Sequence, residues 1–506
     1  MAKRKREAAT NGNAAGKLSS AKKPKAPSRP GQALPFKVSG DGSVTIQIIA
    51  GSYDRVLHGI TATTRSPPTS SVAKPSSKIS GPAAQKAVDF ADTFLFNAHA
   101  SAIRCLALSP PSEPIPGQPQ KVFLATGSTD ERINIYNLSA HPPSSRAADE
   151  QKLLSAVTPR PILENPKNRE LGTLLHHTSN ITKLVFPSRS KLLSGSEDST
   201  IAVSRSRDWA LLHTFKCPVP KVIGRPSGDT AALGGVPSGV NDFAIHPSSK
   251  IMISVSKGER CMRLWNLETG RKSRVLNFSR ETLTEIGEGR HSTGEAHSIV
   301  WGRSGGEDEF AVAFDRDILV FGMDCTPRCR ILGDTKTKVH KVCYVQTGAT
   351  PDETALAVAT EDGRVLFYST DKTDLQDPPK SEAKPARTLP SAKLVAQLGG
   401  KEAGVLTRIK DFAILPVESE DGQRSWYVVT GSSDGKLRLW RLEAGDLQAG
   451  GKKKGSAGKL LETYETQNRI TCVEAFIMIP RPEGVEDSEY EYNDDSSDDD
   501  DSEGDE

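Results

Sequence analysis

The sequence predicts an all-β fold in which seven four-stranded units repeat around a ring. The first observation is a short hairpin motif that recurs seven times along the 506 residues. In each copy an acidic residue follows a turn of small residues and stands six positions before the end of a strand-like run. The second observation is that other alternating or apolar runs surround each hairpin. The third is a C-terminal run that resembles the innermost strand that the first unit lacks.

The hairpin motif pairs an acid with a strand-ending residue. The seven pairs are Asp54/Ile60, Asp130/Tyr136, Asp198/Ser204, Glu259/Trp265, Asp315/Phe321, Asp362/Tyr368 and Asp434/Trp440. A carboxylate in a tight turn accepts hydrogen bonds from the backbone N–H groups that follow it. We therefore expect each acid to fix the register of the two strands that it joins. The aromatic strand ends Tyr136, Trp265, Tyr368 and Trp440 are expected to mark the repeat.

Four strand-like runs in a unit are typical of one blade of a β-propeller. The second unit shows all four, at 103–110, 121–126, 132–136 and 171–175. The later units open at 181–186, 240–247, 298–301, 339–344 and 407–414. The first unit runs from 43–49 directly into the Asp54 hairpin. We expect 470–477 to supply its innermost strand and to close the ring, which removes the unpaired edges at the seam.

The turns lie 47 to 76 residues apart, further than the ~40–45 residues of a plain blade. The excess falls in polar insertions at roughly 61–91, 110–120, 139–169, 218–239, 371–391 and 442–458. Such loops are where binding specificity resides on a rigid scaffold. Within the last insertion, the run from Lys452 to Lys454 is either a contact for backbone phosphates or a solvated charge run.

Charge is segregated along the chain. The formal net charge is +3, but residues 1–35 carry +8 and residues 483–506 carry −14, which leaves +9 for residues 36–482. Both ends lack the apolar content to form a core. We therefore expect a basic disordered tail over 1–40, a propeller over 41–480 and an acidic disordered tail over 481–506.

Two features of the tails carry functional hypotheses. Two basic clusters indicate a nuclear address or a nucleic-acid-binding arm, with a solubilising tail as the alternative; their residues are Lys3, Arg4, Lys5, Arg6, Lys22, Lys23 and Lys25. In the acidic tail, acids stand three residues after Ser496, Ser497 and Ser502, the spacing that acid-directed kinases prefer. Each phosphate would add about −1.5 to −2 charges.

The composition excludes several protein classes. No stretch approaches the ~20 apolar residues of a membrane span, and the N-terminus lacks the apolar core of a secretory signal, so we expect an intracellular protein. The seven cysteines are scattered singly and are expected to be thiols of a reducing compartment. Cys325 and Cys329 are the nearest pair, and one such pair without a second does not make a zinc site.

Catalytic motifs are not evident. The sequence contains neither a Gly-x-x-x-x-Gly-Lys-Ser/Thr phosphate loop nor a His-Glu-x-x-His zinc motif. Adjacent residues on a strand point to opposite faces, so one of His176 and His177 is expected, like His99, to order a turn between blades. We expect no enzymatic activity, no cofactor and no metal, although a fold by itself does not exclude a grafted active site.

The repeat is similar to the WD-repeat signature. The features that carry this similarity are His99 before a strand, the Thr-Gly-Ser-x-Asp turn at 126–130, and the strands that end at Trp265 and Trp440. The order of details at 50–58, 175–182, 194–198, 245–247, 263–271, 296–301 and 468–472 resembles the nucleolar WD-repeat family of p21-activated-kinase-interacting-protein-like large-subunit ribosome assembly factors. The resemblance covers about residues 44–478.

The resemblance implies a non-catalytic scaffold in the nucleus and nucleolus that serves biogenesis of the large (60S) ribosomal subunit. Its expected partners are the pre-60S particle, ribosomal proteins, assembly factors and, through the basic surface, ribosomal RNA, with the propeller itself monomeric. A second implied role is negative regulation of a p21-activated protein kinase. The animal relatives end in a basic tail, whereas this chain ends in an acidic one. An adaptor for a ubiquitin ligase shares the fold and has no distinguishing motif in this chain.

Overall fold

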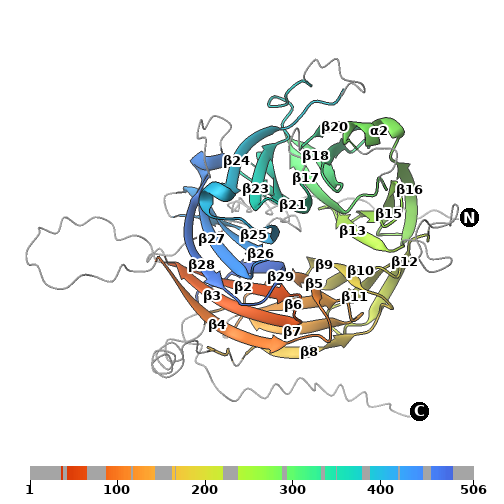
Figure 1. Ribbon diagram of the computed structural model, residues 1–506. Helices are drawn as coiled ribbons and strands as arrows, with labels where there is room; N and C mark the ends of the chain where they lie inside the picture. Colours follow the sequence, from red (N-terminus) through yellow and green to blue (C-terminus); the bar gives the residue numbers. More distant parts are fainter. Residues whose placement is uncertain are drawn as a thin grey trace, which may run out of the picture.

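The protein is an all-β propeller of seven sheets arranged around a central axis (Figure 1). The computed structural model describes residues 36–37, 43–64, 87–115, 118–142, 162–165, 167–219, 238–287, 293–331, 337–348, 350, 352–378, 388–419, 422–447 and 457–481. We number the sheets as blades 1 to 7 in chain order. The predicted fold class and blade count are confirmed.

Each of the first four blades consists of four strands, named below in order from the axis outward. Blade 1 contains β29 (Ile470–Ile477), β2 (Val44–Ser52), β3 (Val56–Thr64) and β4 (Val88–Asn97). Blade 2 contains β5 (Ile103–Leu108), β6 (Lys121–Ser128), β7 (Ile133–Ser139) and β8 (Arg169–Leu174). Blade 3 contains β9 (Ile181–Ser188), β10 (Lys191–Ser196), β11 (Thr200–Arg205) and β12 (Leu211–Lys216). Blade 4 contains β13 (Val240–Ile245), β14 (Ile251–Ser256), β15 (Cys261–Asn266) and β16 (Arg271–Asn277).

The remaining blades follow the same order. Blade 5 contains β17 (Ser298–Ser304), β18 (Glu307–Ala313), β19 (Ile318–Gly322) and β20 (Pro327–Arg330). Blade 6 contains β21 (Val339–Gln346), β22 (Thr354–Thr360), β23 (Arg364–Ser369) and β24 (Lys393–Gly399). Blade 7 contains β25 (Ile409–Glu418), β26 (Arg424–Ser432), β27 (Lys436–Glu443) and β28 (Lys459–Glu465). Short helices α2 (Arg280–Glu285), η1 (Lys401–Ala403) and η2 (Ala444–Leu447) lie in connections.

All seven innermost strands run in the same direction along the axis, because every blade has the same antiparallel strand order. We call the side of the ring at which they begin the start face and the other side the end face. The acidic turns that join the second and third strands of each blade lie on the start face. The chain leaves β29 toward the end face.

The ring is closed by its last strand, as the sequence predicts. β29 pairs antiparallel with β2, so that Val473 lies opposite Ala50 and Cys472 lies opposite Gly51. In Figure 1 this blue strand lies beside the red strands of blade 1. Blade 1 therefore combines the two ends of the propeller, and its closure depends on residues more than 400 positions apart in sequence.

The hydrophobic core lies between neighbouring blades. One cluster joins Ile46 and Ile48 of blade 1 to Val429 and Leu439 of blade 7. A second packs blade 6 against blade 7 and includes Trp426. Each large side chain that is fully buried contributes roughly 1.5–3 kcal/mol relative to its exposed state. Stability therefore comes from contacts between sheets as well as from pairing within them.

Small residues before the acidic turns have a packing role. A Cβ atom on Gly127 would lie 2.6 Å from Ile181 Cγ2 of the next blade, and one on Gly51 would lie 2.8 Å from Ile103 Cγ2. Both distances are shorter than real contacts allow. Glycine is needed at these positions because the innermost strand of the following blade passes directly over the second strand of this one.

One short strand was not predicted. Phe36–Lys37, which the sequence pattern places in the N-terminal tail, forms β1 and pairs parallel with Val417 and Glu418 of β25. Blade 7 consequently has five strands rather than four. The N-terminal segment therefore joins the ring at the end face, the face from which the C-terminal segment also leaves.

Candidate interaction site on the ring

The Asp130 turn is held by a network that spans the connection between blades 1 and 2. His99 Nδ1 lies 3.0 Å from Asp130 Oδ2, and His99 Nε2 lies 2.7 Å from Thr126 Oγ1. Burial lowers the pKa of His99 although Asp130 opposes this, so the ring is neutral at pH 7. Nδ1 then donates to Asp130 and Nε2 accepts from Thr126. Asp130 also accepts from the N–H groups of Ala100 and Arg132, at 3.0 and 3.1 Å.

The Asp198 turn of blade 3 repeats this arrangement. His177 Nδ1 lies 3.0 Å from Asp198 Oδ2, and His177 Nε2 lies 2.7 Å from Ser194 Oγ. Asp198 Oδ1 accepts from the N–H of Thr200 at 2.8 Å. Burial raises the pKa of Asp198, but hydrogen bonds from His177 and Thr200 outweigh burial and bring the pKa down to about 2. One member of the His176–His177 pair thus orders a turn between blades.

Two other blades use a buried arginine in place of histidine. Arg438 of blade 7 donates to Ser432 Oγ at 2.8 Å and to Asp434 Oδ2 at 3.4 Å. Arg263 of blade 4 likewise donates to both carboxylate oxygens of Glu259. Both arginines are buried and both come from the third strand of their own blade. The turn acid is therefore braced from inside the blade rather than from the preceding connection.

The expected bond from an acid to its own following N–H occurs in three of the seven turns, at Asp130, Asp198 and Asp434. Glu259 binds Arg263, and Asp362 accepts from Arg364 Nε at 2.7 Å. Asp315 Oδ1 lies 2.9 Å from Lys338 Nζ. Asp54 Oδ2 accepts from the N–H of Arg469 at 3.1 Å, next to the closing strand. In these four turns the acid therefore contacts other groups, which differs from the expectation.

The strand-end aromatics are core residues. Tyr136, Trp265, Tyr368 and Trp440 are all buried. Trp265 Nε1 donates to Ser254 Oγ at 2.8 Å, and Trp440 Nε1 donates to Thr430 Oγ1 at 3.1 Å. Each indole therefore links the third strand of its blade to the second. These side chains stabilise blades and are not available as a binding surface.

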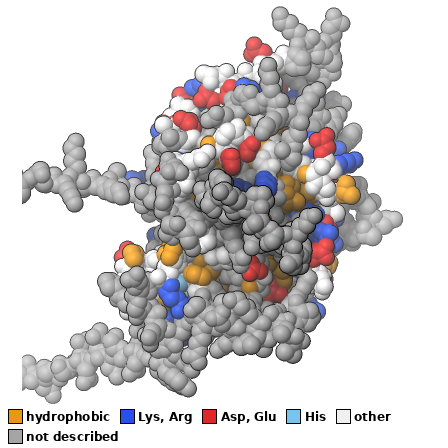
Figure 2. Space-filling view, turned by 90° about the vertical axis from the view of Figure 1, so that its left-hand side faces the viewer, with side chains coloured by type: hydrophobic (Ala, Val, Ile, Leu, Met, Phe, Trp, Pro, Cys, Tyr) orange, Lys and Arg blue, Asp and Glu red, His pale blue; other side chains and the backbone are white. Residues whose placement is uncertain are grey.

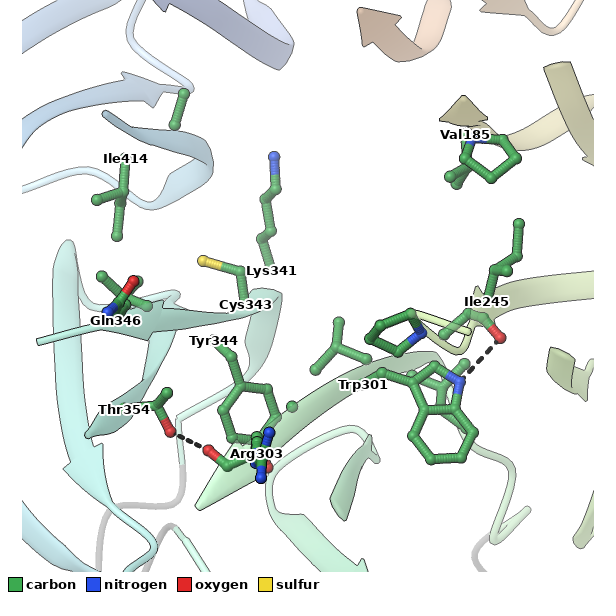
Figure 3. A pocket seen from close by; sticks show the side chains of 18 of the residues that line it. Val185, Ile245, Trp301, Arg303, Lys341, Cys343, Tyr344, Gln346, Thr354 and Ile414 are labelled. Atoms are coloured by element: carbon green, nitrogen blue, oxygen red, sulfur yellow. Dashed lines mark hydrogen bonds between the residues drawn. The ribbon is translucent and has the colours of Figure 1, made fainter. Parts of the chain in front are cut away.

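A cavity of about 740 Å³ occupies the axis of the ring. Its wall comes from the innermost strands of six blades, and Trp301, Tyr344 and Ile414 face the same space from blades 5, 6 and 7 (Figure 3). Trp301 is held by a hydrogen bond from its Nε1 to the carbonyl of Ala244 at 3.1 Å. Most of the lining residues are apolar, and Arg303 and Arg424 are among those that contribute charge.

Two aspartates inside the ring tie consecutive blades together. Asp242 accepts from the N–H of Ile299 at 3.1 Å in blade 5, and its other oxygen lies 3.3 Å from Lys183 Nζ of blade 3. Asp411 accepts from the N–H of Val473 at 2.8 Å in blade 1, and its other oxygen lies 2.6 Å from Lys341 Nζ of blade 6. Each aspartate therefore contacts both neighbours of its own blade.

The positive charge of Lys341 is balanced by a second carboxylate in addition to Asp411. Lys341 Nζ lies 3.3 Å from Glu474 Oε1 of the closing strand. Burial lowers the pKa of Lys341, but Asp411 and Glu474 outweigh burial and raise it above its usual value. The lysine is therefore charged, and it links blade 6 to the two blades that follow.

These axial residues were missed by sequence reasoning, although a signal existed. The string Asp-Phe-Ala-Ile occurs at 242–245 and again at 411–414, in equivalent places of blades 4 and 7. Lys183 and Lys341 are both the third residue of an innermost strand. Gly-x-Ser-x-Gly strings at 302–306 and 431–435 were also overlooked, and both lie in strand-to-strand turns rather than the strand-to-helix turn of a nucleophile elbow.

Several predicted sites lie outside the described residues. These are the basic clusters (Lys3, Arg4, Lys5, Arg6, Lys22, Lys23, Lys25), the run 452–454, and the serines Ser496, Ser497 and Ser502. Within the described part of the chain, no group of three or more His, Cys, Asp or Glu side chains is placed to hold a metal ion. No helix in that part is long and apolar enough to cross a membrane.

The two turns in which a histidine contacts the acid lie within segments that match a family model. The model of the WD domain, G-beta repeat, matches residues 91–137 and 168–203, which contain the turns at Asp130 and Asp198. These matched segments are WD repeats. The chain carries the histidine form of the turn in these two blades and the arginine form in blades 4 and 7.

Over most of its length the chain is homologous to p21-activated protein kinase-interacting protein 1-like proteins and to Protein MAK11. It is 24% identical to a p21-activated protein kinase-interacting protein 1-like protein of Xenopus laevis, over 78% of this chain and 76% of the relative. It is 28% identical to Protein MAK11 of Saccharomyces cerevisiae, over 77% of this chain and 76% of the relative. The corresponding p21-activated protein kinase-interacting protein 1-like protein of Danio rerio is 23% identical, over 87% and 82%.

Proposed function

We propose that this WD-repeat protein is a non-catalytic scaffold for assembly of the large (60S) ribosomal subunit in the nucleolus. The observation that carries the proposal is similarity over more than three quarters of the chain to the p21-activated-kinase-interacting-protein-like proteins and MAK11. The resembled family acts in this process. A match of this length, together with the closed ring of this chain, supports a role for the intact propeller as a binding surface.

The chemistry of the described residues favours binding. The seven turn acids stand in seven different blades, and their partners are turn donors, arginines and lysines of the scaffold. The region from 36 to 482 carries +9 by sequence, which suits a particle that is rich in RNA phosphate. The acidic residues 483–506 add a segment whose charge complements that of basic ribosomal proteins.

Affinity purification of the full-length chain, followed by RNA sequencing and crosslinking at low and high salt, tests the proposal. We expect enrichment of large-subunit precursor RNA, together with large-subunit ribosomal proteins and assembly factors. RNA recovery should fall as salt rises, because phosphate contacts release counterions. Recovery of small-subunit precursors instead, or of no ribosomal precursor at either salt concentration, would contradict the proposal.

A second candidate function is negative regulation of a p21-activated protein kinase by direct binding. The observation that favours it is the name of the vertebrate relatives, p21-activated protein kinase-interacting protein 1-like. The same purification separates the two functions. Recovery of a p21-activated kinase without ribosomal precursor RNA would support the second, whereas precursor RNA without the kinase supports the first.

A further inference from the structure

Three consecutive blades carry a cation directly before the innermost strand. Lys338 precedes β21, Arg408 precedes β25 and Arg469 precedes β29, in blades 6, 7 and 1. The equivalent positions in blades 2 to 5 are Ala102, Asn180, Gly239 and His297. Blades 6 and 7 add His340 and Lys410 one residue inside the strand. We call Lys338, His340, Arg408, Lys410 and Arg469 the basic arc, and it lies on the start face around the mouth of the axis.

The basic arc holds more positive charge than its neighbours balance. Lys338 faces Asp315 at 2.9 Å, and Arg408 faces Glu361 at 3.6 Å. Among the described residues, no carboxylate lies within ion-pair distance of Lys410. Burial lowers the pKa of Lys410, and the charges of Arg408 and Arg469 lower it further, although Glu361 opposes them.

The pKa of His340 also reflects the excess of positive charge in the basic arc. Burial lowers the pKa of His340 to about 4, and Lys410, Lys338 and Arg408 add to this effect. His340 Nε2 is buried and has no hydrogen-bond partner among the described residues. Repulsion between these cations costs folding stability, so the packing of the ring alone does not account for the arc. A bound anion would relieve the repulsion.

An exposed aromatic ring adjoins the cations. Tyr53 is 59% exposed, and the Arg469 guanidinium lies 5.3 Å from the centre of its ring. The N–H of Tyr53 donates to the carbonyl of Arg469 at 2.8 Å, which fixes the backbone beneath the ring. Cations beside an open aromatic face are the combination that binds single-stranded nucleic acid, because the phosphates meet the cations and a base stacks on the ring.

Figure 2 shows one edge of the ring, and the described residues on that edge are mixed in charge. In the view of Figure 2, Lys and Arg side chains alternate with Asp, Glu and hydrophobic side chains over the coloured part of the surface. Mixed charges of this kind favour water or weak contacts over a phosphate backbone. The start face between blades 6 and 1 is therefore the better candidate for RNA.

We propose that the basic arc and Tyr53 bind single-stranded RNA, with phosphates on Lys410, Arg469 and their neighbours and a base stacked on Tyr53. The inference deepens the proposed function and rests on it, since it assigns a surface for contact with precursor RNA. An acidic protein segment would use the same cations without needing the face of the ring. The role of Tyr53 therefore distinguishes the two kinds of partner.

The test measures binding of a labelled oligouridylate to the full-length protein by fluorescence anisotropy across a salt series. The variants are Lys410→Gln with Arg469→Gln, and Tyr53→Leu. The matched control, Lys191→Gln with Lys216→Gln, removes the same charge from exposed positions of blade 3. Tyr53→Phe keeps the aromatic face, and thermal melting checks that each variant is folded.

The double arc variant is expected to reduce the slope of log K against log salt by about 1.4, since each single-strand phosphate contact contributes ~0.7. Tyr53→Leu is expected to weaken binding roughly tenfold, while Tyr53→Phe and the blade 3 control bind like the wild type. Wild-type binding by the double arc variant would overturn the inference. So would an equal loss of oligouridylate and polyglutamate binding with no effect of Tyr53→Leu, which would indicate a protein partner.

The two experiments distinguish an error in this RNA-binding surface from an error in the proposed function. If the wild-type chain recovers large-subunit precursors while the arc variants bind oligouridylate normally, the function stands and this surface is wrong. If the chain recovers no ribosomal precursor but the arc variants lose oligouridylate binding, the surface stands and the function is wrong.

Discussion

At the scale of single residues, the turn acids of four blades are held in two different ways. In blades 2 and 3 a buried histidine is hydrogen-bonded to the acid, and in blades 4 and 7 a buried arginine donates to it. The sequence predicted where the acids lie, because the small-residue turn and the spacing recur. It predicted that His99 orders a turn between blades, but it did not predict which acid the ring contacts, nor the role of Arg438, because both side chains reach their turns only after the blades pack.

Replacing Asp130 with alanine tests the histidine form of the turn. The change leaves His99 and the N–H groups of Ala100 and Arg132 without their acceptor. We expect a loss of about 1–3 kcal/mol in the free energy of unfolding, measured by urea denaturation. Asp208→Ala is the control, since Asp208 is an exposed acid paired with Arg205, and it should change little. Full stability of the Asp130 variant would show that the turn is held by other contacts.

His340 makes a prediction about pH. Its pKa falls from 6.5 to about 4 in the folded protein, so the unfolded chain binds a proton that the folded chain does not between these values. Stability is therefore expected to decline as pH falls from about 6.5 to 4. His340→Gln should remove that part of the decline, as measured by urea denaturation at each pH. A variant with the wild-type pH profile would contradict the assignment.

Asp198 also makes the stability of the fold decline as pH falls, but over a lower pH range. Its pKa is about 2 in the folded protein against 3.8 in its ordinary state, so its contribution is complete above about 3.8 and is lost as pH falls toward 2. Asp198→Asn should flatten the acid limb of the stability profile. Loss of stability that is equal at pH 7 and pH 2 would show that the charge of Asp198 is not what matters.

At the scale of elements, the order of the strands was predictable from the sequence. The contacts by which Asp242 and Asp411 connect neighbouring blades near the axis were not. The four runs of each blade and the return of 470–477 could be read from local patterns. The two-residue strand β1 carries no local signal, since its pairing with β25 spans most of the chain. Asp411 lies in a strand that was predicted, yet its contacts with Lys341 and Val473 depend on how three blades meet.

Asp411→Ala tests the contacts by which Asp411 connects blade 7 to blades 6 and 1. It removes the acceptor of the Val473 N–H and leaves Lys341 with Glu474 alone. We expect a loss of roughly 3 kcal/mol in the free energy of unfolding. Asp411→Asn keeps an oxygen acceptor for Val473 and should lose less. If the two variants were equally stable by urea denaturation, the charge and the hydrogen bond could not both contribute as described.

Removal of the closing strand tests the seam of the ring. A chain that ends at Glu465 lacks β29 and leaves β2 with an open edge and the buried side chains of Ile49 and Leu57 partly uncovered. We expect loss of the cooperative thermal transition seen by circular dichroism. A chain that ends at Arg481 keeps β29 and should melt like the full-length protein. An unchanged melting temperature after removal of β29 would contradict closure by this strand.

At the scale of the whole molecule, the fold separates two surfaces. The start face carries the braced turns and the basic arc, and the end face receives β1 and releases the chain after β29. This separation could not be predicted from composition, because a net charge does not say which side of a ring the charges occupy. It becomes visible once all seven innermost strands are known to run the same way.

Depletion of this protein from cells, followed by pulse labelling of ribosomal RNA, tests the role in large-subunit assembly most directly. We expect mature large-subunit RNA to fall while small-subunit RNA is maintained. The full-length chain should restore maturation, whereas the chain that lacks β29 should not, because the role requires the closed ring. Normal production of large-subunit RNA after complete depletion would contradict a role in large-subunit assembly.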